Sequence, residues 1–226
     1  MDVLDKVRAL LGNAPLQLGS ADIISTGRLQ STDGTLVDYE IREGCNIQLG
    51  FTCDKLWRDF NVKLMAFIDK NVAEADRETV LDQIQIDDDH WEWMIKSAAM
   101  RTDEFRWFFL TANNEPQGAC VIRHPKKSIL NTGDIFYIEF IATAPWNREN
   151  PMEARRFRSV ATLLIRCASK YAHDVLKLRY GFSLQAIERA VAYYQKLGMK
   201  PHPPSDQPPL SYYEMEEPDA KLLAGQ

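Results

Sequence analysis

The sequence predicts a mixed α/β (α+β) fold with a largely antiparallel central sheet flanked by helices. Three strand-like runs follow one another between residues 105 and 143 with short connections, which is the order of an antiparallel meander. Stretches with apolar residues at helical spacing precede and follow these runs, and further strands lie between the later helices. The 226 residues, 45% hydrophobic and 26% charged, fit one large globular domain with an extension.

Composition excludes several classes of protein. A net charge of -5 argues against a general nucleic-acid binder, and no apolar run has the length needed to cross a bilayer. The first six residues have neither the charge layout nor the apolar core of a signal peptide, so we expect a cytoplasmic protein. The cysteines and histidines show neither a CxxC pair nor ligand spacing, so we expect reduced thiols and no metal site.

The chain divides into three predicted segments. Residues 1–35 are an N-terminal extension, with a helix over Val3–Leu11 and a possible short strand at Asp22–Thr26. This extension could be a hairpin arm or a homodimer contact, and the sequence leaves both open. Residues 36–217 are the main domain, and residues 218–226 are expected to be a frayed tail.

The first half of the main domain is predicted to hold one strand and two helices. Leu36–Ile41 alternates loosely and indicates a strand. Asp54 is a candidate cap for a helix running to Asn71 with an aromatic and apolar stripe. The acidic triplet Asp87–Asp89 precedes a short amphipathic helix, where negative charge favours the helix N-terminus. A metal site is the alternative interpretation of the triplet.

The meander comes next. Its strands are predicted over Phe105–Thr111, Gly118–Arg123 and Ile135–Thr143, and Asn113–Pro116 is a hairpin turn. A lone carboxylate, Glu139, stands in the middle of the third strand.

Two helices and two strands complete the domain. A helix begins near Val160 and follows the 3.6-residue period, and Leu176–Tyr180 is a short strand. Ser183 is expected to cap a second helix that Gly198 closes at its C′ position. Leu210–Met215 is the last predicted strand.

Glu139 is the first candidate functional residue. Because strand side chains alternate between faces, it shares a face with apolar neighbours and is expected to be desolvated. Burial would raise the pKa of its carboxyl group, which suits a general base working near neutral pH. The alternatives are a glutamate at a sheet edge or one paired with an arginine.

Two further stretches carry candidate chemistry. Residues 156–161 place arginines, small side chains and backbone N–H groups at the start of a helix, which suits a phosphate or pyrophosphate. Many helices begin with arginine and serine for structural reasons alone. Tyr194 lies on the apolar stripe of the last predicted helix, and its hydroxyl could donate a proton or simply bond a backbone carbonyl.

Together these stretches resemble the GNAT (Gcn5-related N-acetyltransferase) superfamily. The last helix is similar to that family's A-x-x-F-Y-x-x-x-G-F signature through Ala190, Tyr193, Tyr194, Gly198 and Met199. The third meander strand resembles the family's fourth strand, and residues 156–161 resemble its pyrophosphate loop, usually Q/R-x-x-G-x-G/A. The chain departs from this pattern where Ser159 replaces the first glycine and where the connection 147–155 is longer than usual.

The resemblance implies an enzyme that transfers an acetyl group from acetyl-CoA to a primary amine in a ternary complex, without a covalent intermediate. It implies that Glu139 accepts the amine proton and that Tyr194 protonates the departing thiolate. Cys167 lies on a core stripe and is a poor nucleophile candidate. The resemblance implies the following CoA contacts: backbone groups of Ile141, Ala142 and Thr143 to the pantetheine arm, Arg156, Phe157, Arg158, Ser159, Val160 and Ala161 to the pyrophosphate, and Ser183 near the pantetheine.

Two alternatives remain open from the sequence. Ser159 and the long connection are compatible with a non-catalytic acyl-CoA-binding or partner-binding module on the same fold. The local arginine cluster at residues 155–158 suggests acylation of a charged RNA or a basic protein, but the acidic net charge argues against it. The sequence does not identify the acceptor, its acyl-chain preference or the oligomeric state.

Overall fold

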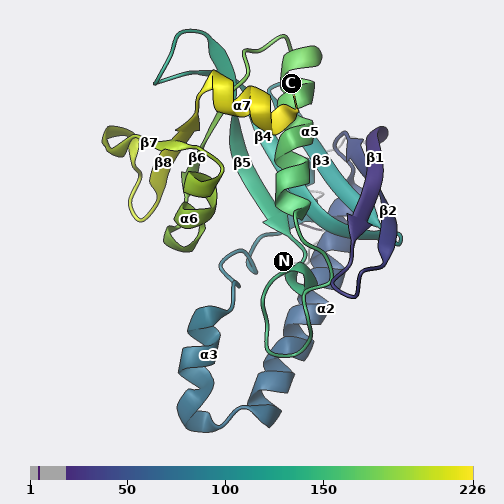
Figure 1. Ribbon diagram of the computed structural model, residues 1–226. Helices are drawn as coiled ribbons and strands as arrows, with labels where there is room; N and C mark the ends of the chain where they lie inside the picture. The colour runs from purple at the N-terminus through teal and green to yellow at the C-terminus, as the bar shows by residue number, and fades with distance from the viewer. Residues whose placement is uncertain (1–4, 6–18, 226) are drawn as a thin grey trace. The chain divides into compact units, whose positions relative to one another are not determined.

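The computed structural model describes Asp5 and residues 19–225 (Figure 1). The predicted helix over Val3–Leu11 lies outside the described residues except for Asp5. The strands are β1 (Asp22–Gln30), β2 (Leu36–Glu43), β3 (Phe105–Ala112), β4 (Glu115–Lys127), β5 (Asp134–Thr143), β6 (Phe182–Ala186), β7 (Lys200–Pro201) and β8 (Ser211–Met215). The helices are α2 (Ile47–Asn71), α3 (Arg77–Gln83), α4 (Trp93–Ala99), α5 (Val160–Asp174), α6 (Glu188–Lys196) and α7 (Glu217–Ala224), with 3-10 turns η1 (Glu74–Asp76), η2 (Pro145–Asn147) and η3 (Pro203–Ser205).

The strands form one eight-stranded sheet in the order β1-β2-β3-β4-β5-β6-β8-β7. The pairs β1–β2, β2–β3, β6–β8 and β7–β8 are antiparallel, and β5–β6 is parallel. This confirms the predicted fold class and the three meander strands. Asn113 and Asn114 join β3 to β4 with φ of 54° and 61°, the left-handed conformation that a two-residue hairpin turn requires.

The chain separates into two compact units. Unit 1 holds the described residues up to 102 together with 107–119 and 142–161, and unit 2 holds 103–106, 120–141 and 162–225. Strands β3, β4 and β5 each have residues in both units. None of the helices in the described part of the chain is long and apolar enough to cross a membrane.

In unit 1 the long helix α2 begins earlier than predicted. Its cap is Asn46, whose side chain accepts from the backbone N–H of Leu49. Asp54 instead lies on the second turn of α2 and accepts from the backbone N–H groups of Trp93 and Met94, at 2.7 and 2.9 Å. The predicted cap therefore serves a different helix, α4. A sequence pattern locates a capping side chain but not the helix whose N–H groups it meets.

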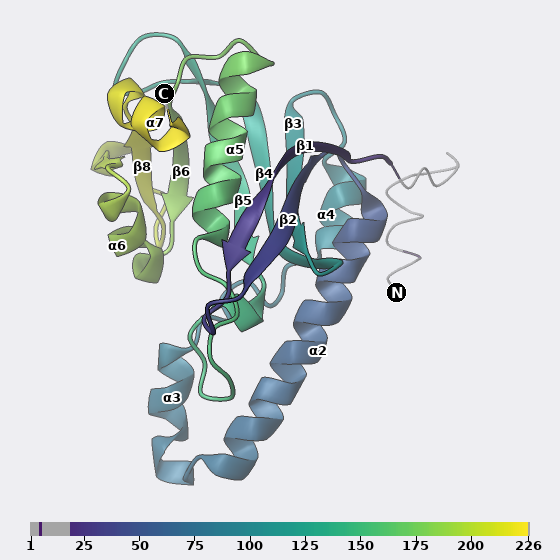
Figure 2. The ribbon, with the colours of Figure 1, turned by 45° about the vertical axis from the view of Figure 1, so that its right-hand side comes forward.

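Helices α2 and α4 cross closely because of one glycine. A Cβ atom at Gly50 would lie 2.9 Å from the carbonyl oxygen of Trp93 and 3.0 Å from backbone atoms of Met94. Only a residue without a side chain fits this crossing. The long helix is clear in Figure 2, where α2 runs past α4 and continues well beyond it.

Unit 2 corrects the prediction for Ser183. This residue does not cap a helix; it lies in strand β6, paired with Tyr137 of β5 and Glu214 of β8. The predicted strand Leu176–Tyr180 is a connection, and the strand forms a few residues later. A serine before an apolar stripe predicts a helix cap, but here the residue is paired with a strand on each side. Gly198, by contrast, closes α6 with a φ of +95°, as predicted for a C′ position.

The prediction that residues 218–226 form a frayed tail is also wrong. Residues 217–224 form α7, with a proline in its first turn and Gly225 in the left-handed conformation after its last residue. Ala220 and Ala224 are buried. Small side chains supply this buried face, so the segment lacks the bulky apolar stripe that predicts a helix from sequence.

Candidate functional site

Glu139 lies in the middle of β5, in unit 2, and faces an arginine. The Nε of Arg123, on β4, donates to Oε2 of Glu139 at 3.1 Å. The Glu139 side chain is 26% exposed and that of Arg123 is 39% exposed. The structure therefore replaces the expected apolar, desolvated surroundings with a half-exposed ion pair, the alternative in which this glutamate is paired with an arginine. The apolar pattern of β5 did not reveal the partner, because Arg123 comes from the neighbouring strand.

Strand β5 leaves β6 soon after the two strands begin. The parallel pair is in register at only two positions, Phe136 with Phe182 and Tyr137 with Ser183. Both strands continue beyond this pairing, β6 to Ala186 and β5 to Thr143, and Figure 1 shows them separating. Glu139 and Ile141 lie on the part of β5 beyond the registered pairs. Ser183, which is fully buried, lies at the last of them.

Tyr194 is enclosed by unit 2. Its side chain is 7% exposed, and burial raises the pKa of its phenol well above the ordinary value. The hydroxyl group therefore stays protonated over the physiological range. The preceding Tyr193 bonds through its hydroxyl to Oγ1 of Thr162 on α5, at 3.1 Å.

The cysteines have the character of core residues. All four are free thiols, and burial raises the pKa of Cys167 to about 12. A thiol held protonated in this way is a poor nucleophile, in keeping with the expectation for Cys167. Among residues 19–225, no three or more His, Cys, Asp or Glu side chains are placed to hold a metal ion.

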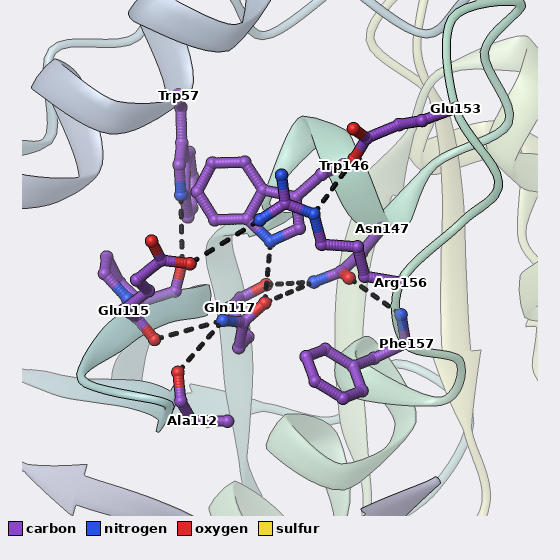
Figure 3. A network of polar contacts seen from close by, with 10 residues as sticks. Trp57, Ala112, Glu115, Gln117, Trp146, Asn147, Glu153, Arg156 and Phe157 are labelled. Carbon is purple, nitrogen blue, oxygen red and sulfur yellow. Dashed lines mark hydrogen bonds and ion pairs between the residues drawn. The ribbon is translucent and has the colours of Figure 1, made fainter. Parts of the chain in front are cut away.

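In unit 1, a buried polar network fixes the start of the long connection from β5 to α5 (Figure 3). Oε1 of Gln117 accepts from Nε1 of Trp146 at 2.7 Å and from Nδ2 of Asn147 at 3.0 Å. Nε2 of Gln117 donates to the carbonyl oxygens of Ala112 and Glu115. Every polar atom of this buried amide is therefore engaged, and η2 is held to the hairpin between β3 and β4.

Asn147 also closes the connection at its far end. Its Oδ1 accepts from the backbone N–H of Phe157 at 3.0 Å, and the N–H of Arg156 donates to the carbonyl oxygen of Trp146 at 2.9 Å. The two ends of residues 148–155 are thus bonded to each other, as in an Ω-loop. Phe157 is buried and forms a β-bridge with Ser31, which follows β1.

Arg156 is committed to protein partners. Its Nε bonds Oε1 of Glu153 at 2.9 Å, an ion pair to Glu115 measures 3.6 Å, and its guanidinium lies 4.9 Å from the centre of the Trp146 ring. Figure 3 shows its side chain directed toward these groups. The Arg156 guanidinium, expected to contact a pyrophosphate, thus forms ion pairs with Glu153 and Glu115. Its place in the loop is held by its backbone, where its carbonyl accepts from the N–H of Thr32.

Ser159 has the backbone conformation of a glycine. Its φ is +64°, in the left-handed region, and it is exposed immediately before α5. Arg158 is exposed beside it, whereas Val160 is buried, and Ala161 is half-buried at the start of the helix. Ser159 thus has a backbone conformation that glycine adopts without strain. Backbone N–H groups at such a turn into a helix are suited to an anion.

The carbonyl oxygen of Thr143, at the end of β5, is already occupied. Nε and Nη2 of Arg148 donate to it at 2.9 and 2.6 Å, and Arg148 also pairs with Asp88, with Nη1 2.6 Å from Oδ1. Arg148 is only 7% exposed. Asp88 therefore neutralises a buried arginine and does not cap a helix, and Asp89 accepts from Nδ2 of Asn61 at 2.6 Å. Of the three expected pantetheine partners on β5, Ala142 is buried, Ile141 is half-buried, and Thr143 has its carbonyl bonded within the protein.

Three residues that the sequence did not single out matter here: Arg123, Gln117 and Asn147. Arg123 ends a predicted strand next to the strand of Glu139, so a cross-strand pair could have been inferred from adjacent strands in a meander. Gln117 and Asn147 carry no local signal, because their partners come from four separate segments of the chain.

No family model matches the chain, and no curated protein matches it. Several solved structures do. An uncharacterized protein from Bacillus halodurans has a TM-score of 0.50 at 10% identity, over 90% of this chain and 96% of that one. The PaiA N-acetyltransferase of Thermoplasma acidophilum in complex with coenzyme A has a TM-score of 0.46 at 12% identity, over 79% and 98%. The N-acetyltransferase PseH of Campylobacter jejuni has a TM-score of 0.39 at 13% identity, over 65% and 93%. At these identities the similarity concerns the fold alone.

Proposed function

We propose that the chain is an acyltransferase with the fold of the GNAT superfamily, which transfers an acetyl group from acetyl-CoA to the amine of an acceptor. The observation that carries the proposal is the early separation of β5 from β6. Because only Phe136 and Tyr137 of β5 are in register with β6, the backbone beyond them can pair with an extended ligand. A pantetheine arm has the length and the amide groups to take that place.

The N-terminus of α5 would hold the pyrophosphate of the donor. Ser159 supplies a left-handed turn, and the N–H groups that follow it are those a helix leaves unpaired. The exposed Arg158 is the side chain available for a charge-assisted bond, since Arg156 is engaged with Glu153 and Glu115.

Glu139 and Tyr194 would carry the proton transfers. The acceptor nitrogen attacks the thioester carbonyl, so that a C–N bond forms and the C–S bond breaks. Glu139 takes the proton lost by the nitrogen, directly or through water, and Tyr194 gives its hydroxyl proton to the departing thiolate of CoA. The support for this assignment is the match of Tyr194 to the tyrosine of the signature helix, A-x-x-F-Y-x-x-x-G-F. The thioester is already activated, so no covalent enzyme intermediate is needed.

Two measurements test the proposal. Titration calorimetry with acetyl-CoA and with CoA should show saturable binding, and the absence of heat at millimolar ligand would refute it. Release of CoA thiol in the presence of a panel of amines should depend on Glu139, so that Glu139→Gln loses the activity but keeps the binding. Binding without release for any amine would instead support a non-catalytic acyl-CoA-binding module.

A further inference from the structure

Arg123 is a half-exposed arginine with most of its hydrogen-bonding capacity unused. Its Nε donates to Glu139, and its guanidinium carbon lies 5.3 Å from the centre of the Tyr137 ring. Among the described residues, no protein acceptor meets its Nη1 or Nη2. A guanidinium has five N–H donors, so four remain for another group.

The surroundings of Arg123 fix its direction. Glu139 accepts from Nε, and the guanidinium carbon lies over the ring of Tyr137. Tyr137 and Glu139 are two residues apart on β5 and therefore face the same way. Contacts to Glu139 and Tyr137 thus fix the position of the Arg123 side chain, which carries the free Nη groups. An arginine held in this way presents a preformed geometry to a ligand.

A contribution to folding stability is a weak explanation for the ion pair between Arg123 and Glu139. Half-exposed pairs contribute little to folding, about 0–1 kcal/mol. The pair is also monodentate, through Nε, whereas an arginine that serves only a carboxylate can use two parallel bonds. What this arrangement does provide is a negative and a positive group side by side on one strand pair.

We propose that Arg123 binds an anionic group of the acceptor, a carboxylate or phosphate attached close to the reacting amine. This inference rests on the proposed function and names its substrate class. The ammonium form of such an acceptor would meet Glu139 while its oxyanion meets Nη1 and Nη2 of Arg123. An acceptor with both groups matches the adjacent charges of the Glu139–Arg123 pair, and a simple amine matches only one of them. Arg123 is then a specificity residue that touches the substrate.

The test compares acceptors in matched sets. Each α-amino acid is assayed beside its amide and its decarboxylated amine, and phosphoethanolamine beside ethanolamine, with acetyl-CoA saturating. We expect kcat/KM to be about ten- to a hundredfold higher for the anionic member of a set, the range for a hydrogen bond to a charged group. Preference for the amino acids would identify a carboxylate, and preference for phosphoethanolamine a phosphate.

The variants are Arg123→Gln, Arg123→Lys and the control Arg28→Gln, an exposed arginine on β1. Arg123→Gln should remove the preference by raising the KM for the acceptor and not that for acetyl-CoA. Arg123→Lys should restore part of it, and Arg28→Gln should leave it unchanged. Equal kcat/KM within every set, or a preference that survives in Arg123→Gln, overturns the inference while the proposed function stands. If calorimetry shows no acetyl-CoA binding in the same preparations, the proposed function fails and the inference fails with it.

Discussion

Nδ2 of Asn147 lies 3.0 Å from Oε1 of Gln117, and this hydrogen bond joins the segment after β5 to the start of β4. Gln117 is buried, and Trp146 donates to the same oxygen. The amide thereby fixes both ends of the Ω-loop, because Asn147 in turn holds the backbone of Phe157.

Gln117→Leu should destabilise the protein by roughly 1–3 kcal/mol, the cost of one unsatisfied buried donor. It leaves the Trp146 indole N–H without its acceptor, while Nδ2 of Asn147 keeps a second acceptor, the backbone carbonyl of residue 117, at 3.2 Å. Urea unfolding followed by tryptophan fluorescence measures the change. Gln48→Leu, at an exposed position of α2, is the matched control and should change stability by no more than about 0.5 kcal/mol. Similar stability of the two variants would show that the network is not a stabilising element.

Ser159→Gly should raise stability by about 0.5–1 kcal/mol, since glycine adopts a φ of +64° without the steric penalty that serine bears. Thermal unfolding measures it. The same variant should bind acetyl-CoA at least as tightly, because the backbone could approach a phosphate more closely. Ser159→Ala keeps the penalty and removes only the hydroxyl, so tighter binding by both variants would point to the side chain and not to the backbone.

Tyr194→Phe should lower kcat by about 10²–10⁴ while the acetyl-CoA dissociation constant stays within a few-fold. The phenol is the proposed donor to the CoA thiolate, and its burial keeps it protonated. Thiol release and calorimetry give the two quantities. Tyr193→Phe is the control, because the family signature has phenylalanine there and the Tyr193 hydroxyl bonds only Thr162 among the described residues. An unchanged kcat in Tyr194→Phe would remove this residue from the mechanism.

Stability should fall as pH rises from about 4 to about 6, through Asp54. Burial raises the pKa of its carboxyl group to about 6, and the N–H groups of Trp93 and Met94 only partly oppose the rise. The folded state thus binds a proton that the unfolded state has lost in this window, so protonation favours folding. Denaturant titrations across pH 4–7 should show the slope in the wild type and a smaller one in Asp54→Asn. Equal slopes would assign the dependence to other groups.

Elements that follow from local periodicity and turn residues were predicted from the sequence. Contacts between residues that are distant in the sequence were not. The meander, the helix from Val160 and the closing Gly198 follow from local periodicity and turn chemistry, and the structure has them. Ser183 was misplaced because a serine before an apolar stripe has the same local pattern whether it caps a helix or lies in a paired strand.

The candidate site shows the same division. Glu139 stood out as a carboxylate in an apolar strand, but its environment is set by Arg123, sixteen residues earlier on β4. Neither the glycine-like φ of Ser159 nor the internal engagement of Arg156 was predicted, and the latter depends on Glu115 at the hairpin between β3 and β4. Side-chain pairing across strands and loops is therefore the information that the sequence pattern lacked.

The bridge between Ser31 and Phe157 has a consequence for synthesis on the ribosome. The chain between these residues must be made before the bridge can form, and at roughly 5–20 residues per second that delay lasts about 6–25 seconds. During this time the turn between β1 and β2 has no Arg156 carbonyl to receive the N–H of Thr32. The emerging hairpin therefore lacks these two contacts until the segment before α5 leaves the ribosome, and that segment also contains the start of the proposed pyrophosphate loop.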